Sequence, residues 1–194
     1  MSSENFQLTL TTKAPTDIWR KPPSLDVLNA ATSLKTIKLS KFKSAVVTVS
    51  ATWERLYDQG GLFVLFPQYS GTKQFWLKTG IEFYNGSAQL SVVSAREWAD
   101  WSLFELAPGT KEVTVRIERE INKDQTLGSS LMVYFVPADV DGQSTRKMVR
   151  EVTWAFEKEE GDLQIGVYAA RPTELDGDTE SLSVKYDWSY EIFE

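Results

Sequence analysis

The chain has 194 residues, 42% hydrophobic and 25% charged, with a formal net charge of −6, values typical of one globular domain. It contains neither histidine nor cysteine, which excludes a Ser-His-Asp triad, a cysteine nucleophile, a disulfide and an ordinary zinc site. The acidic balance argues against nucleic acid as a partner, because phosphate contacts need a basic surface. We expect no metal and no cofactor.

The start of the chain shows no targeting signal. The sequence "MSSENFQLTL" lacks the basic and apolar regions of a secretory signal, and no stretch approaches the roughly 18 apolar residues of a membrane span. We therefore expect a cytoplasmic protein with no membrane partner.

The first 35 residues are expected to form an N-terminal arm that packs on the rest of a single domain, residues 1–194. Pro15, Pro22 and Pro23 interrupt any regular strand ladder in this part. Trp19 is the large apolar side chain that would anchor the arm.

The chain as a whole is predicted to be all-β, because runs of β-branched and aromatic residues alternate with turn residues. The expected strands span residues 6–12, 36–39, 44–53, 61–66, 75–84, 88–95, 111–119, 131–136, 151–157, 163–170 and 181–192. Their alternating apolar and polar side chains fit a two-sheet antiparallel β-sandwich or jelly roll.

The segment "WLKTGIEFYNG" raises the main functional question. As a strand it sends one set of residues to the face opposite the core: Trp76, Lys78, Gly80 and Glu82. Lys78 and Glu82 would lie roughly 13 Å apart along the strand, so each needs its own partner. Gly80 predicts a bulge or a close approach to the backbone, and Asn85-Gly86 predicts a tight hairpin turn.

Two later segments are expected to be irregular. Residues 96–109, "REWADWSLFELAPG", are predicted to form a long connection of the kind that often carries function on a sandwich. The segment "ELDGDTE", with Asp176, Asp178 and Glu180, superficially suggests calcium but lacks the full ligand set of an EF-hand. We expect it to be a solvated turn.

Four segments together carry a family resemblance: "WERLYDQGGLFV" (53–64), "FWLKTGIEFYNG" (75–86), "ADWS" (99–102) and "IGVYAARP" (165–172). In this order the chain resembles a domain-of-unknown-function family with a concanavalin A-like fold, in particular its fungal branch, the regulation-of-enolase proteins. The resemblance implies a concanavalin A-like jelly roll with a concave face, an influence on enolase and no established catalytic activity. The family-pattern positions are Tyr57, Asp58, Gln59, Lys78, Glu82, Asp100 and Trp101.

The predicted ligand-binding residues combine flat aromatic surfaces with directional polar groups, as expected of a preformed small-molecule cleft. They are Tyr57, Gln59, Trp76, Lys78, Glu82, Trp101 and Arg116, assigned to the concave face. The alternative interpretation makes the same residues a buried charge network under the 96–109 connection, with the tryptophans packing the core.

No residue is predicted to be catalytic. Glu82 with Glu118 is the best carboxylate pair for glycoside hydrolysis, which needs two carboxyls flanking the scissile bond. Lys78 and Arg116 as immediate neighbours would hold Glu82 ionised, which suits an ion-pair network better than a general acid.

Two functional classes therefore remain open. The chain is expected to be a non-catalytic regulatory protein that acts on enolase or another metabolic enzyme through protein binding. The alternative is a lectin-like protein that binds a saccharide or small metabolite on the concave face.

Overall fold

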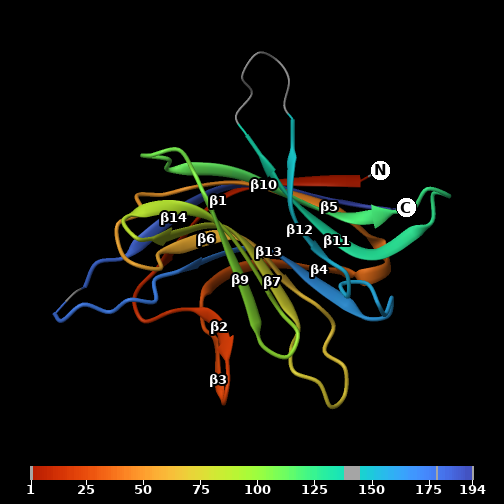
Figure 1. Ribbon diagram of the computed structural model, residues 1–194, viewed down its shortest axis with the longest axis horizontal. Helices are drawn as coiled ribbons and strands as arrows, with labels where there is room; N and C mark the ends of the chain where they lie inside the picture. The colour runs from red at the N-terminus through yellow and green to blue at the C-terminus, as the bar shows by residue number, and fades with distance from the viewer. Residues whose placement is uncertain (1, 138–144, 178, 194) are drawn as a thin grey trace.

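The computed structural model describes residues 2–137, 145–177 and 179–193. Within these residues the chain forms two six-stranded sheets and one separate hairpin (Figure 1). The helical structure of this part is the single 3-10 turn Leu39–Lys41, and no helix there is long and apolar enough to cross a membrane. The all-β prediction is confirmed.

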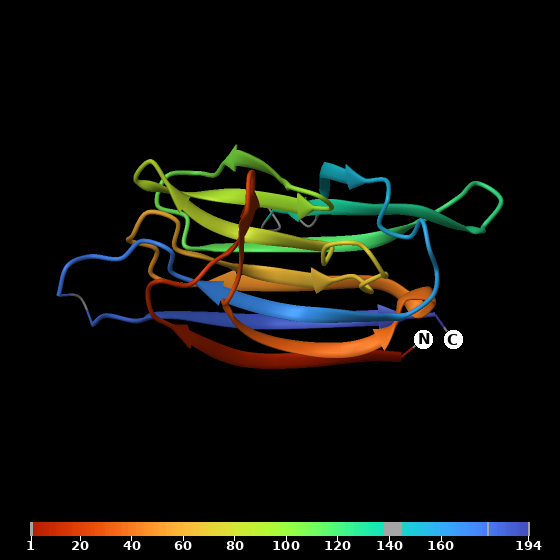
Figure 2. The same cartoon turned by 90° about the horizontal axis from the view of Figure 1, so that it is seen from below.

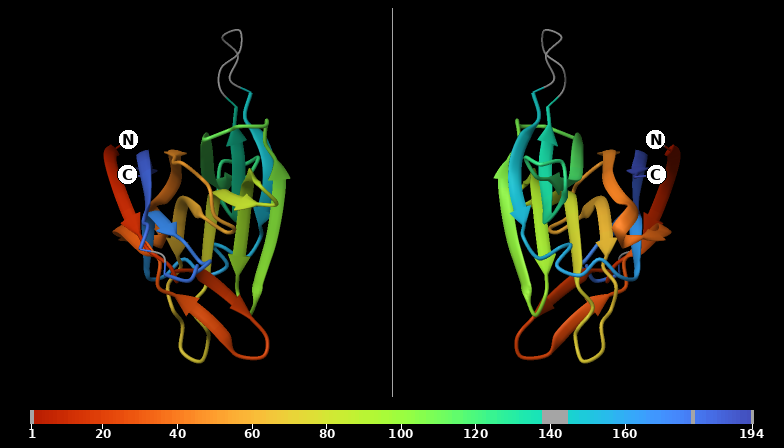
Figure 3. Two further views of the ribbon diagram at one scale, coloured as in Figure 1. Left: turned by 90° about the vertical axis from the view of Figure 1, so that its left-hand side faces the viewer. Right: turned by 90° about the vertical axis from the view of Figure 1, so that its right-hand side faces the viewer.

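The first sheet contains both ends of the described chain, which lie side by side (Figure 3). All of its neighbouring strands are antiparallel. In spatial order they are β1 (Ser2–Thr12), β14 (Leu182–Ile192), β5 (Phe42–Ser50), β10 (Glu112–Ile121), β11 (Leu127–Val136) and β12 (Lys147–Val152).

The second sheet is also antiparallel throughout its described strands. In spatial order they are β4 (Ala31–Lys38), β13 (Asp162–Ala170), β6 (Gln59–Leu65), β7 (Trp76–Tyr84), β8 (Ser87–Ala95) and β9 (Ala99–Glu105). The two stacked sheets form the predicted β-sandwich of jelly-roll type.

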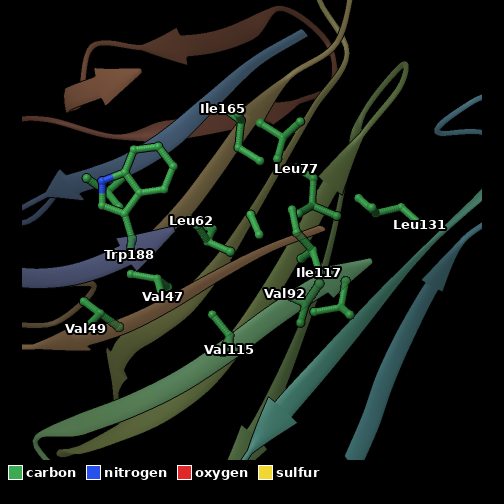
Figure 4. Packing of buried hydrophobic residues seen from close by; sticks show 14 of the residues in the cluster. Val47, Val49, Leu62, Leu77, Val92, Val115, Ile117, Leu131, Ile165 and Trp188 are labelled. Carbon is green, nitrogen blue, oxygen red and sulfur yellow. The ribbon is translucent and has the colours of Figure 1, made fainter. Parts of the chain in front are cut away.

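The main hydrophobic core fills the space between the two sheets. Alternation along the strands supplies it, as predicted, since Val113, Val115 and Ile117 of β10 are all buried. Figure 4 shows side chains from both sheets meeting there, among them Val47, Val115 and Trp188 of the first sheet and Leu62, Leu77 and Val92 of the second.

A second apolar cluster lies on the outer face of the second sheet, the face turned away from the main core. Phe63 and Trp76 point to this side because they alternate with the core residues of β6 and β7. They pack with Tyr168 of β13 and with Ile18 of the hairpin β2 (Ile18–Lys21) and β3 (Leu25–Leu28). Figure 2 shows this hairpin crossing the strands of the second sheet.

The predicted N-terminal arm is shorter than residues 1–35. Residues 2–12 form edge strand β1, paired with β14, and residues 31–38 form edge strand β4, paired with β13. Only residues 13–30 leave the two large sheets. The strand predicted at residues 6–12 lies within β1 and is confirmed, and the strand predicted at 36–39 covers only the end of β4.

The predicted irregular connection at residues 96–109 is wrong over half its length. Residues 99–105 form strand β9, which pairs with β8 along its whole length. This strand is also at an edge, and its partly exposed side chains do not alternate in burial. The Asn85-Gly86 turn between β7 and β8 is confirmed, with φ values of 50° and 78°.

Strands β6 and β7 approach unusually closely at the paired glycines Gly61 and Gly80. A Cβ atom on Gly61 would lie 2.0 Å from the carbonyl oxygen of Thr79, and one on Gly80 would lie 2.1 Å from that of Gly60. The close approach that Gly80 predicted is therefore made by the backbone of the neighbouring strand.

The glycine pair gives the first testable expectation. Gly61→Ala should lower the free energy of unfolding by about 3 kcal/mol or more, because the backbone of β7 must move. Gly71→Ala is the matched control, since nothing lies within 4 Å of its Cβ position and its φ of +76° adds only local strain, worth about 1 kcal/mol. Urea denaturation measures both, and equal losses would contradict the close approach.

Candidate functional site

The β2–β3 hairpin and the outer face of the second sheet enclose a pocket of about 270 Å³. Side chains of β6 and β7 form its floor, and the hairpin, the segment before β6 and strand β9 form its walls. The lining residues are Asp17, Trp19, Lys21, Leu25, Tyr57, Gln59, Lys78, Glu82 and Trp101.

Lys78 lies on the floor and is only 1% exposed. Its ammonium group donates to Oε1 of Gln59 at 2.5 Å and lies 3.7 Å from Oδ1 of Asp17. In the β6–β7 ladder, Lys78 lies opposite Phe63 and Gln59 lies opposite Glu82. The glycine pair Gly61–Gly80 lies between these two positions, and therefore between Lys78 and Gln59. Without side chains at that pair, Lys78 and Gln59 can meet across the sheet surface.

Glu82 is the second charged residue on the floor and is 5% exposed. Its Oε2 accepts a hydrogen bond from the hydroxyl of Ser91 at 2.8 Å. Ser91 in turn accepts from the indole Nε1 of Trp101 at 3.3 Å. Lys78 and Glu82 thus have separate hydrogen-bond partners, as their predicted spacing along β7 required.

Burial opposes the charged forms of both floor residues. It raises the pKa of Glu82 above its ordinary value, an effect that Lys78 and the Ser91 hydroxyl partly offset. Burial also lowers the pKa of Lys78, and the carboxylates of Glu82 and Asp17 counteract that shift. The pocket floor therefore presents an ammonium group and a carboxylate that are both poorly solvated.

Asp17 links the hairpin to this floor. Its Oδ1 accepts from the backbone N–H of Ile18 at 2.7 Å and from Nε2 of Gln59 at 3.1 Å. Its side chain is 27% exposed, so it lies at the boundary between the floor and solvent.

Aromatic rings form the walls. Trp101 of β9 meets Trp19 of the hairpin edge-on, with ring centroids 6.0 Å apart, and meets Tyr57 at 6.3 Å. Tyr84 supports both, stacked on Tyr57 at 6.0 Å and edge-on to Trp101 at 5.5 Å. These amphipathic rings offer flat apolar surfaces close to the polar floor.

A buried ion pair holds Tyr57 and Gln59 in place. Asp58, which is fully buried, accepts two hydrogen bonds of 2.8 Å from Arg171 and one of 3.1 Å from the backbone N–H of Arg55. Tyr57 adopts a left-handed backbone with φ of 66°, and its N–H donates to the carbonyl of Phe83 at 2.7 Å. The family-pattern position Asp58 is thus structural.

Five of the seven predicted ligand-binding residues line this pocket: Tyr57, Gln59, Lys78, Glu82 and Trp101. Trp76 shares their face but is fully buried beside Ile18 in the second apolar cluster. Asp100, another family-pattern position, is exposed and forms an ion pair with Arg150 at 3.1 Å.

The assignment of Arg116 to this site is wrong. Arg116 is in β10 of the first sheet and alternates with buried Val115 and Ile117, so it points away from the sandwich. There it contacts Glu118 at 2.5 Å and donates to Ser44 at 3.0 Å. Glu118 is on the same outer face, so the proposed carboxylate pair with Glu82 is separated by both sheets.

Sequence reasoning missed the four lining residues from the hairpin, Asp17, Trp19, Lys21 and Leu25. The sequence indicates Trp19 only as an anchor, and strands of four residues are too short to show a period.

In the acidic segment "ELDGDTE", Asp178 lies outside the described residues. Among the described residues, no group of three or more metal-ligating side chains occurs.

The burial of Glu82 predicts a pH dependence. A carboxyl whose folded-state pKa is raised contributes stability that is present below its ordinary pKa of 4.5 and lost as the pH rises through the folded value. Glu82→Gln removes this titration. In denaturation experiments the free energy of unfolding of the wild type, minus that of the variant, should therefore fall as the pH rises from 4.5 through the raised folded-state pKa of Glu82. A difference that rises with pH would contradict the burial of Glu82.

Comparisons with known proteins identify fungal relatives. The chain is 44% identical over 172 residues to an uncharacterized protein of Emericella nidulans, a match that covers 87% of this chain and 80% of that protein. It is 32% identical over 117 residues to Regulation of enolase protein 1 of Saccharomyces cerevisiae, which covers 60% of this chain and 56% of the yeast protein.

Solved structures support the same fold. A functionally unknown protein from Saccharomyces cerevisiae has a TM-score of 0.66 at 24% identity, covering 96% of this chain and 87% of that one. A Bacillus licheniformis β-glucanase has a TM-score of 0.51 at 13% identity, covering 97% and 79%. The model of the family described as "Protein of unknown function (DUF1349)" matches residues 1–191, and the chain therefore belongs to the DUF1349 family.

Proposed function

We propose that this protein binds a small polyhydroxylated ligand of the saccharide class in the pocket, without converting it. The observation that carries the proposal is that a buried ammonium group and a buried carboxylate lie on the floor of one pocket whose wall contains three aromatic rings. A few convergent polar groups in a largely apolar, preformed pocket are typical of small-molecule sites.

The floor matches the chemistry of a ligand with several hydroxyl groups. Each hydroxyl both donates and accepts, so one hydroxyl of a ligand can accept from Lys78 while another donates to Glu82. An ammonium group has three donors and a carboxylate about four acceptor sites, so the bonds to Gln59 and Ser91 leave capacity for a ligand. The rings of Trp19, Tyr57 and Trp101 would cover the apolar face of a sugar ring.

The role of Asp17, the other carboxylate that lines the pocket, supports the assignment of binding without conversion. Glycoside hydrolysis needs a second carboxyl that acts as nucleophile or base beside the proton donor. Oδ1 of Asp17 already accepts from Ile18 and Gln59 and lies near Lys78. We therefore assign Asp17 to holding the hairpin on the floor.

A thermal-unfolding screen tests the binding. Monosaccharides, oligosaccharides, sugar phosphates and glycolytic intermediates are added to the wild type, Glu82→Gln, Lys78→Met and the control Arg116→Gln, whose side chain lies on the other sheet. At 100 times its dissociation constant a ligand stabilises the fold by about 2.7 kcal/mol, which raises the melting temperature by about 5 to 10 °C.

The expected result is a shift in the wild type and in Arg116→Gln that is lost in both floor variants. No shift with any compound, or an equal loss in Arg116→Gln, would count against the pocket as a binding site. Release of a hydrolysed product during the assay would contradict the non-catalytic assignment.

A second candidate function is regulation of a metabolic enzyme in the cytoplasm through protein binding. The specific observation in its favour is the similarity to Regulation of enolase protein 1. The two functions are compatible, because a ligand in the pocket could bias a protein contact made elsewhere on the surface.

Regulation through enolase predicts a direct complex. Purified enolase mixed with this protein should form a complex that sedimentation velocity detects at physiological ionic strength, about 0.15 M. The turnover rate of enolase should change in the same mixture. Glu82→Gln serves as the comparison that separates a pocket-dependent contact from an independent one. No complex at tens of micromolar of both proteins would exclude this mode of regulation.

A further inference from the structure

The β2–β3 hairpin is held firmly on the second sheet. Ile18 is fully buried in the second apolar cluster. Arg20, also in β2, is 1% exposed, and its Nη1 donates to the carbonyl of Gln74 at 2.9 Å. Its Nε lies 2.9 Å from Oδ1 of Asp26 in β3, which ties the two strands of the hairpin together.

The backbone ahead of the hairpin is fixed as well. The N–H of Thr16 donates to the carbonyl of Arg171 at 3.1 Å, and the N–H of Arg171 donates to the hydroxyl of Thr16 at 3.0 Å. The hairpin is therefore part of the folded framework, attached at its base and along β2.

The hairpin also reaches the far wall of the pocket. The Trp19–Trp101 contact joins it to β9, and the Trp101–Tyr57 contact joins β9 to the segment before β6. The three rings form one continuous aromatic wall around the floor. A chain of sugar residues lying along the sheet would meet this wall and the hairpin that crosses the strands (Figure 2).

The volume of the pocket sets the size of its occupant. At about 270 Å³ it falls just below the range of about 300 to 1,000 Å³ found for pockets that hold drug-sized ligands. One or two sugar rings fit such a space, and the other units of an extended oligosaccharide would lie outside it.

We propose that the pocket accepts a free monosaccharide or the terminal residue of a glycan, and that the β2–β3 hairpin excludes the interior of a polysaccharide. This inference rests on the proposed function and adds the form of the ligand. Lys78 and Glu82 bind hydroxyls of that single residue, and Lys21 and Leu25 of the hairpin stand beside it. Trp19 determines the limit on chain length.

A length series tests the inference by isothermal titration calorimetry. The probes are gluco- and xylo-oligosaccharides of several linkages, from the monosaccharide to the hexasaccharide, together with hexasaccharides methylated on both terminal residues. In the series that binds, the affinity should level off at one or two units. Methylation of the ends should weaken binding at least about tenfold, equal to 1.4 kcal/mol.

The variant Trp19→Ala removes the ring contact between the hairpin and β9. In this variant the affinity should increase with the length of the saccharide. Trp98→Ala is the matched control, because Trp98 contacts Lys73 outside the pocket lining and should leave the plateau unchanged. Both variants are first compared with the wild type by circular dichroism to establish that they are folded.

Each outcome separates the two proposals. Affinity in the wild type that rises about tenfold from disaccharide to hexasaccharide, or end-methylated probes that bind as well as free ones, would overturn the limit on chain length and leave the binding function intact. No binding by any saccharide would overturn the binding function, and the limit on chain length with it.

Discussion

The packing of the β2–β3 hairpin on the outer face of the second sheet is the contact on which the pocket depends. An antiparallel sheet usually has one face on the core and one in water. Here Ile18 covers Trp76, Phe63 and Tyr168 on what would otherwise be the water side. The hairpin thereby turns part of an outer surface into an interior, and Lys78 and Glu82 are enclosed with it.

Enclosing two charges has an energetic consequence. A buried charge is tolerated only where hydrogen bonds and an opposite charge compensate for lost solvation. Lys78 has Gln59 and the nearby Asp17, and Glu82 has Ser91. This compensation is incomplete, as the opposite pKa shifts of the two residues indicate. Perturbed titratable groups gathered in one pocket are a frequent mark of a functional site.

The fold by itself is a weak guide to this function. The Bacillus licheniformis β-glucanase shares the architecture at 13% identity, but one fold supports many unrelated functions. The distinguishing features lie in the details of this chain: a hairpin seated on the sheet, aromatic rings from three separate segments, and a single ammonium–carboxylate floor. Those features carry the proposals of binding and of a limit on ligand length.

The pattern along the chain was enough to predict the β-sandwich, the Asn85-Gly86 turn and the face shared by Lys78 and Glu82, because alternation and turn chemistry are local properties. The same pattern could not place Arg116 on the other sheet. Alternation shows which residues of a strand share a face, but it does not show which strands are neighbours in space.

The edge strand β9 and the short hairpin strands escaped prediction for a related reason. Their side chains are only partly buried, and they have few residues in which a period can appear. Alternation of side chains and the positions of turns can be read directly along the chain. The meeting of Asp17 and Trp19 with Lys78, Glu82 and Trp101 cannot be read in this way, because it depends on long-range packing of the hairpin across the sheet.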